Sequence, residues 1–246
     1  MATPVICPVN HPALMARLLA HPGLTMDESA PATTGHLAWK QGNWARTLFF
    51  DGTPAPDAHQ GPQMGLVELM DNNPLVCADI VSLPTPSATL ALIALGPLVR
   101  AGLMVEGPTL TFSFAADPES LADHLELMGW QLGADLVVDP QDLGPVGAAH
   151  VLALIPTPED DAVIDELYDE CYARSFFVRR TEAETWDTRL VAGQPHAAYR
   201  LAITPGDPHS LLRIQVMADF GGKMGADQVI HALNVMLGFE ESLGLI

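Results

Sequence analysis

The chain has 246 residues, of which 48% are hydrophobic and 17% are charged. This length and composition exclude a disordered chain and allow one or two domains with their own cores. Thirty acidic residues against eleven basic ones give a formal net charge of −19. We expect no nucleic-acid partner, because such binding needs a basic footprint, and phosphorylated ligands would meet an unfavourable field. Adaptation to solubility or high salt would explain the same acidity.

The sequence also gives no indication of a membrane-spanning segment or a metal-binding site. No apolar run reaches the length of about 18 residues that a membrane span needs, and the N-terminus lacks a basic stretch followed by an apolar core. We therefore expect a cytoplasmic protein with no membrane partner. Cys7, Cys77 and Cys171 have no CxxC spacing, and the nine histidines follow no ligand spacing. The sequence thus predicts neither a disulfide framework nor a metal site.

The N-terminal third shows few regular elements. An apolar run at residues 4–9 predicts a strand, and an apolar stripe at helical spacing follows it and ends at residues 21–23, which read HPG. Residues 27–63 are rich in Pro, Gly, Thr and His, with one predicted strand at 46–50. A further apolar run at 75–81 predicts another strand.

The rest of the chain alternates between helical and strand patterns. This alternation is typical of α/β and α+β folds, and the last two strands predict an antiparallel run that leads into a terminal helix. The predicted helices cover residues 89–103, 121–128 and 159–173, and the predicted strands cover residues 110–114, 151–155, 197–203 and 211–218.

The C-terminal segment, residues 219–246, carries the clearest pattern. Apolar residues from Ala226 to Leu237 recur at the spacing of an amphipathic helix, and Gly238 follows at a position that suits a left-handed residue. Lys223 lies in the predicted first turn of the helix, where a cation opposes the helix dipole. Either a ligand outside the helix requires this charge, or Lys223 is a solvated surface lysine.

Several motifs together resemble N-acetyl-γ-glutamyl-phosphate reductase, the NADPH-dependent semialdehyde dehydrogenase of arginine biosynthesis. The resemblance is faint at RLLAHP (17–22) and good over residues 65–105 and 162–246. It includes GLVEL at 65–69, the helix at 89–103, FFVR at 176–179 and TRLVAG at 188–193. In the terminal segment the matching residues are Lys223, Ala226, Gln228, Leu233, Asn234, Met236 and Gly238, whereas Met224 and Asp227 replace two family glycines.

This resemblance implies an α/β (α+β) fold with two parts. Residues 81–218 would form a semialdehyde-dehydrogenase-like dimerisation domain with a mixed or antiparallel sheet and helices. Residues 1–80 would form a truncated Rossmann-like remnant of the nucleotide-binding domain, with residues 219–246 packing on it. The family's α/β domain mediates oligomerisation, so the resemblance also implies a homo-oligomer or a partner protein.

The chemical parts of the family are missing. The family's glycine-rich phosphate loop is replaced by residues 8–12 (PVNHP), which contain no glycine and whose prolines remove amide donors, so we expect no NADPH and no other cofactor. Alignment places Thr85 or Pro86 where the family has its cysteine nucleophile, and a threonine hydroxyl is a poor substitute. Cys77 is expected to be a buried small hydrophobe, and acidic neighbours should raise the pKa of the Cys171 thiol.

We therefore read the chain as a non-catalytic relative of the reductase that acts as a binding or assembly protein. The alternative is an enzyme with a rebuilt active site that uses Lys223, Arg179, His124 or His150 on a small substrate. A small-molecule sensor is a third reading. The resemblance implies no catalytic residue, and it gives Lys223, Gln228 and Arg179 as substrate-binding candidates. A pocket lined by these three would favour an enzyme or a sensor, whereas an exposed apolar patch over an edge strand would favour assembly.

Overall fold

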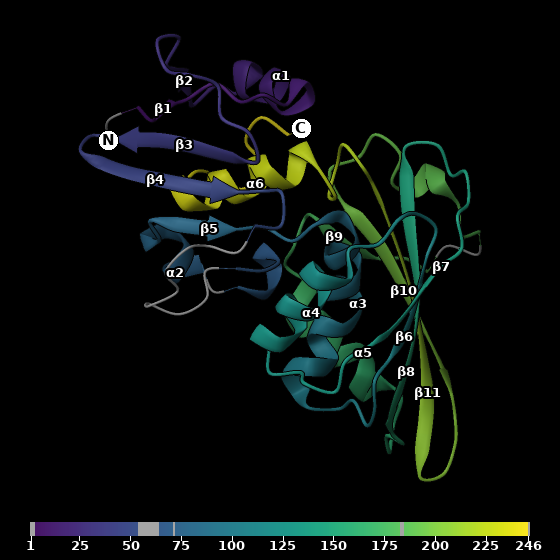
Figure 1. Cartoon of the computed structure of the whole chain (residues 1–246). Coiled ribbons are helices and arrows are strands. Elements are labelled where there is room, and N and C mark those ends of the chain that lie inside the picture. The colour runs from purple at the N-terminus through teal and green to yellow at the C-terminus, as the bar shows by residue number, and fades with distance from the viewer. Residues whose placement is uncertain (1–2, 54–63, 71, 183–184, 246) are drawn as a thin grey trace. The chain divides into compact units, whose positions relative to one another are not determined.

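The computed structural model describes residues 3–53, 64–70, 72–182 and 185–245 (Figure 1). The chain divides into two compact units, one formed by residues 1–85 with 225–246 and the other by residues 86–224. Each unit contains one mixed β-sheet, with five strands in the first unit and six in the second. The predicted fold class, a mixed α/β fold, is confirmed.

Within its described residues, the first unit has three α-helices and a five-stranded sheet. Its elements are β1 (Val5–Ile6), α1 (Pro12–Ala20), β2 (Thr25–Met26), β3 (His36–Gln41), β4 (Trp44–Phe49), the 3-10 helix η1 (Val67–Leu69), α2 (Asn72–Cys77), β5 (Ile80–Ser82) and α6 (Ala226–Leu237). The strand order is β2-β1-β3-β4-β5, in which β1–β2 and β4–β5 are parallel pairs and the other pairs are antiparallel. A two-residue turn with Gly42 at a φ of +66° joins β3 to β4 as a hairpin.

A buried arginine ties several elements of the first unit together. The guanidinium of Arg46 on β4 donates to the carbonyl oxygens of Leu75 and Ala78, each at 2.8 Å, and to that of Met236 on α6. These carbonyls lie at or just beyond the C-terminal ends of α2 and α6, where helices leave oxygens without intrahelical donors. Arg46 thus satisfies two helix ends at once, and α1 and α2 both pack against α6.

The second unit is a six-stranded sheet with helices on one face (Figure 1). Its elements are α3 (Pro86–Ala101), β6 (Thr109–Phe112), α4 (Pro118–Leu127), β7 (Asp135–Val138), β8 (Val146–Pro156), α5 (Ala162–Tyr172), β9 (Val178–Arg180), η2 (Thr188–Leu190), β10 (Ala197–Thr204) and β11 (His209–Asp219). The strand order is β7-β6-β8-β11-β10-β9. The two longest strands, β8 and β11, pair antiparallel along their whole length, from His209 opposite Pro156 to Asp219 opposite Val146.

The two faces of this sheet differ in character. Side chains such as Val151, Ala153 and Ile214 are buried beneath α3, α4 and α5, whereas their neighbours in the strands point to the opposite face. On that opposite face, the partly exposed positions of β8 and β11 include His150 and Gln215. In the part of the chain that the structure describes, no α-helix covers this second face (Figure 1). We call it the open face.

Helix α3 contains an internal proline whose effect is compensated by α5. Pro97 has no amide hydrogen, so the carbonyl of Ile93, four residues earlier, loses its usual helical donor. The hydroxyl of Tyr172 lies 3.1 Å from that oxygen and donates to it, and the hydroxyl of Tyr168 donates to the carbonyl of Ala94. Two buried tyrosines therefore repair the helix at the point where its sequence interrupts it.

Most predicted elements of the second unit are present, but one prediction in the first unit is wrong. The apolar run at 75–81 does not form one strand, because its first half ends the short helix α2 and only its last residues enter β5. As a consequence Cys77 is exposed and is not the buried hydrophobe that we expected. Strands β3 and β7 were not predicted from the sequence. The prediction that the terminal helix ends at Gly238 is confirmed by a left-handed φ of 68°.

Candidate functional site

Lys223 is not a solvated surface lysine. It lies in the turn between β11 and α6, ahead of the helix and not in its first turn, and its side chain is fully buried. Its ammonium nitrogen lies 5.6 Å from the centre of the Phe177 ring, within range of a cation–π interaction. Burying an ammonium group is costly unless it is compensated, and the Phe177 ring provides part of that compensation.

The other two substrate-binding candidates have different surroundings. Gln228 is buried in α6, and its amide nitrogen donates to the carbonyl of Pro84 at 3.4 Å. Arg179 on β9 is exposed, and its guanidinium lies over the ring of Phe176 at 4.4 Å and donates to that residue's carbonyl. Lys223 and Arg179 belong to the second unit and Gln228 to the first. Their joint role in binding a substrate stays a prediction.

Residues 8–12, which the sequence resemblance aligns with the family's phosphate loop, lead into the start of α1. Pro12 is the first residue of the helix and has no amide hydrogen to offer. The amide of Leu14, two residues further on, is also used, because it donates to Nδ1 of His11, the N-cap residue, at 3.2 Å. A phosphate group at this helix terminus would have to compete with the histidine cap, which is consistent with the expectation that no NADPH binds.

Of the cysteines weighed as nucleophiles, Cys77 is exposed, whereas Cys171 does not have the surroundings of a reactive thiol. Burial raises the pKa of the Cys171 thiol, and the nearby charge of Glu170 adds to the shift, although Arg100 opposes it. The predicted direction is confirmed, but burial and not the acidic neighbours is the main cause. Thr85 is buried and directly precedes α3, whose first residue is Pro86, so neither aligned position presents a thiol.

Of the two histidines considered for a rebuilt enzyme, His124 has a structural role. It is buried in α4, and its Nδ1–H donates to the Ser120 carbonyl at 2.6 Å. Burial lowers the pKa of His124, so the ring is neutral near pH 7. His150 differs, because it lies on the open face of the six-stranded sheet and lines a cavity.

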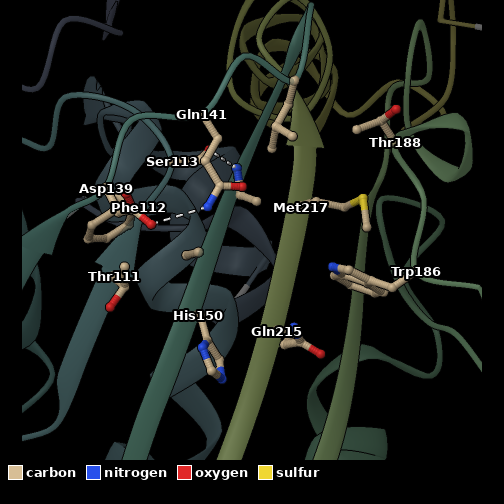
Figure 2. Close-up of a pocket in the computed structure, with 13 residues that line it drawn as sticks. Thr111, Phe112, Ser113, Asp139, Gln141, His150, Trp186, Thr188, Gln215 and Met217 are labelled. Atoms are coloured by element: carbon tan, nitrogen blue, oxygen red, sulfur yellow. Dashed lines mark hydrogen bonds between the residues drawn. The ribbon is translucent and has the colours of Figure 1, made fainter.

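This cavity was not predicted from the sequence. It has a volume of about 410 Å³ and is lined by 13 residues from β6, β8, β11 and two loops (Figure 2). Its floor is a row of directly paired residues on three neighbouring strands: Thr111 lies opposite His150, and His150 lies opposite Gln215. The open face therefore brings polar side chains together that are far apart in the sequence.

Two loops form the walls of the cavity. On one side, Asp139 and Gln141 follow the edge strand β7, and the Gln141 amide donates to the Asp139 carboxylate at 3.3 Å. On the other side, Trp186 and Thr188 face the same space (Figure 2). We name the whole set the sheet cavity; its lining residues are Thr111, Phe112, Ser113, Asp139, Gln141, Leu143, Ala148, Ala149, His150, Trp186, Thr188, Gln215 and Met217.

Arg200, which is outside the lining, holds two of these residues in place. Its Nε–H donates to Oε1 of Gln215 at 2.7 Å, and its guanidinium lies 4.8 Å from the ring centre of Trp186. Burial lowers the pKa of His150, and the charge of Arg213 lowers it further. The Nε2 atom of His150 is buried and has no hydrogen-bond partner among the described residues. The cavity thus has polar side chains in its lining. Arg200 contacts two lining residues, and the Nε2 atom of His150 lacks a hydrogen-bond partner among the described residues.

Sequence reasoning identified His150 but not the site around it. The only local signal is the alternation of polar and apolar residues in β8 and β11, which marks a sheet with one face toward solvent. The partners of His150 depend on strand register, which the sequence did not specify. Within the described residues, no group of three or more His, Cys, Asp or Glu side chains is placed to hold a metal, and no helix is long and apolar enough to cross a membrane.

Comparison with known proteins shows the fold and no more. No protein-family model and no curated protein matches the sequence. Among solved structures, aspartate semialdehyde dehydrogenase II of Vibrio cholerae complexed with ASA is similar, with a TM-score of 0.51 and 12% identity, over 72% of this chain and 68% of that chain. A further structure of the same enzyme has a TM-score of 0.48 and 13% identity, over 70% of this chain and 67% of that one. The chain therefore has a semialdehyde dehydrogenase-like fold.

Proposed function

We propose that this chain is a non-catalytic relative of N-acetyl-γ-glutamyl-phosphate reductase that acts by association, with itself or with a partner protein. The motifs that resemble the family are those that pack, such as the proline-containing helix α3. The parts that would perform the chemistry are absent from the sequence, because residues 8–12 lack glycine and neither Thr85 nor Pro86 is a cysteine. A fold retained without its nucleophile favours binding over dehydrogenase chemistry.

The observation that carries this proposal is the apolar end of the open face. Leu211 on β11 lies directly opposite Leu154 on β8, and its side chain is 40% exposed although it belongs to the centre of the sheet. On the edge strand β7, Val137 and Val138 are 46% and 45% exposed. Apolar side chains on an uncovered sheet face and on an edge strand favour association, because covering them removes apolar surface from water.

The test is the molar mass of the purified protein, measured by light scattering after size exclusion. We expect a mass at least twice that of the chain for the wild type, and a monomer for Leu211→Asp, because a carboxylate would then be buried at the interface. Val163→Asp is the matched control, since Val163 on α5 is 50% exposed on the helical side of the unit. A monomeric wild type that captures no partner from its native host would contradict the proposal.

The burial of Lys223 favours a second candidate, an enzyme with a rebuilt active site. A fully buried ammonium group next to an aromatic ring is unusual in a protein that only packs. This candidate is tested by calorimetric titration with NADPH and by an assay for oxidation of N-acetylglutamate semialdehyde in the presence of phosphate and NADP. We expect neither saturable binding nor turnover. Turnover that disappears in Lys223→Met would establish the enzyme instead.

A further inference from the structure

The sheet cavity has the size and composition of a small-molecule site. Its volume of about 410 Å³ falls in the lower part of the range of about 300–1,000 Å³ that is typical of ligand pockets. Eight of the 13 lining residues have side chains that form hydrogen bonds, and these eight come from both walls and from the floor. A cavity this polar does not suit a purely apolar ligand, because its polar groups would lose water without replacement.

The charge of the lining limits the ligand further. Asp139 is the one carboxylate, and the described lining contains no lysine and no arginine. The formal net charge of −19 adds a repulsive field for any anion. The nearest cations, Arg200 beside Gln215 and Arg213 near His150, lie outside the lining. A phosphate or carboxylate group would therefore meet Asp139 without a cationic side chain in the lining itself, whereas a neutral molecule faces no such cost.

The remaining polar groups suit hydroxyls. Gln215 has its carbonyl oxygen fixed by Arg200, which leaves its amide nitrogen as a donor, while Thr111 and Thr188 contribute hydroxyls that both donate and accept. The Asp139 carboxylate accepts hydrogen bonds only. The unpartnered Nε2 of His150 shows that the floor has hydrogen-bonding capacity that the protein itself does not use.

Trp186 supplies an aromatic wall opposite these groups. The guanidinium of Arg200 lies 4.8 Å from the centre of the indole ring and packs against it. An indole wall packs well against the apolar C–H face of a saturated ring, while planar amide and carboxylate side chains bind the hydroxyls at its edge. This combination distinguishes a polyhydroxylated ring from a linear polyamine or a fatty chain.

We infer that the sheet cavity binds a small, neutral, polyhydroxylated molecule of about monosaccharide size, with its ring against Trp186 and its hydroxyls on Asp139, Gln141, Thr111 and Gln215. The cavity lies along the row of His150 and Gln215, whereas Leu154 and Leu211 mark the apolar end of the open face. Val137 and Val138 lie opposite Thr111 and Phe112 of the cavity, so only the Leu211 part of the proposed association surface is separate from the site. Ligand binding and molar mass are measured separately and can fail separately.

The experiment is saturation-transfer NMR on the full chain, followed by calorimetry, with glucose, galactose, N-acetylglucosamine and myo-inositol as neutral probes. Glucose 6-phosphate and glucosamine serve as the anionic and cationic probes. We expect saturable binding of at least one neutral probe at millimolar concentration or below, and much weaker binding of the phosphorylated probe. Absence of binding by every neutral probe, or binding confined to the phosphorylated or the cationic probe, would overturn the inference.

Variants locate the binding. Trp186→Ala should weaken it by about tenfold or more, because the aromatic wall is lost. The matched control is Trp130→Ala, which removes an indole elsewhere in the same unit, where it donates to the Gly133 carbonyl. Thr111→Val keeps the shape and removes one hydroxyl, so it should weaken binding even if Trp186→Ala does not fold. Unchanged binding in folded Thr111→Val and Trp186→Ala would also overturn the inference.

Discussion

Helices α3 and α6 are both enclosed along most of their length, yet their buried residues differ in kind. Twelve consecutive residues of α3, from Ser87 to Leu98, are buried, and Ser87 and Thr89 are the polar ones among them. All twelve residues of α6 are buried as well, but four of these are strongly polar. They are Asp227, Gln228, His231 and Asn234. Burial of α3 follows from hydrophobicity alone, whereas burial of α6 requires partners for each polar group.

Those partners hold the C-terminal tail and helix α1 against α6. The Asn234 amide donates to the carbonyls of Glu241 and Leu243, and its side-chain oxygen accepts a hydrogen bond from His21 at 2.9 Å. Arg17 forms a salt bridge with Asp227 at 2.7 Å. Polar residues of α6 that resemble the reductase family are therefore used here, at least in part, for structure.

The largest expected effect is the same for both helices. Leu233→Ala in α6 and Leu90→Ala in α3 should each lower the free energy of unfolding by about 2–5 kcal/mol, because both side chains are fully buried and their loss leaves a cavity. Denaturant unfolding followed by circular dichroism measures this. Leu19→Ala is the control: Leu19 on α1 is 65% exposed, and its variant should differ by less than about 0.5 kcal/mol. If Leu233→Ala unfolds like the wild type, α6 is not docked.

The second prediction separates the two helices. Asn234→Leu keeps a similar volume but removes the hydrogen bonds that Asn234 makes with the carbonyls of Glu241 and Leu243 and with the ring of His21. We expect a loss of about 1–3 kcal/mol in the free energy of unfolding, since each buried orphan group retains its desolvation cost. Gln194→Leu, at an exposed position, is the matched control and should change little. If Asn234→Leu leaves the free energy of unfolding unchanged, the burial of α6, like that of α3, does not depend on hydrogen bonds from its polar side chains.

The third prediction concerns the proline in α3. Tyr172→Phe removes the donor to the Ile93 carbonyl and should cost about 1 kcal/mol. In a Pro97→Ala background the restored backbone amide can bond that oxygen, so the same substitution should cost less. A double-mutant cycle measured by denaturant unfolding gives the coupling. Additive effects would show that Tyr172 does not compensate for the proline.

The same contrast explains how much the sequence could predict. The helices other than α2 have apolar stripes at helical spacing, and the resemblance to a known family includes the proline-containing helix, so these elements were found. The run at 75–81 was misread because a short apolar stretch fits a buried strand and a helix end equally well. Lys223 could be solvated or buried according to its pattern, and only tertiary packing decides between the two.

The sheet cavity could not be predicted for a different reason. Its floor joins Thr111, His150 and Gln215, which become neighbours only through the register of three strands. Its walls come from loops whose sequences have no periodicity. A residue such as His150 can be noticed in the sequence, but a site made by cross-strand pairing requires the register, and a shift of one residue would place its side chains on the other face.

The smallest expected effect is a dependence of stability on pH that arises in part from His21 beside α6. The Gly23 amide donates to Nδ1 of His21, so the proton is on Nε2, which donates to Asn234, and a second proton would face the Gly23 amide. Burial lowers the pKa of His21 in the folded state, opposed by its hydrogen bonds to Asn234 and Leu243. The unfolded chain then binds more protons than the folded one, so the stability is complete above about pH 6.5 and is lost as the pH falls below that value. His124, His150 and His196 also have lowered pKa values, chiefly through burial, and act in the same direction.

Thermal unfolding from about pH 7.5 to about pH 5.5 should therefore show a falling melting temperature in the wild type and a weaker fall in His21→Gln. His209→Gln is the matched control, because His209 is exposed at the start of β11, and its variant should keep the slope of the wild type. Since His21 is one of four such histidines, removing it should reduce the slope without abolishing it. A slope that is unchanged in His21→Gln would mean that the histidine beside α6 is not held in its neutral form, and His21 would then not contribute to the pH dependence of stability.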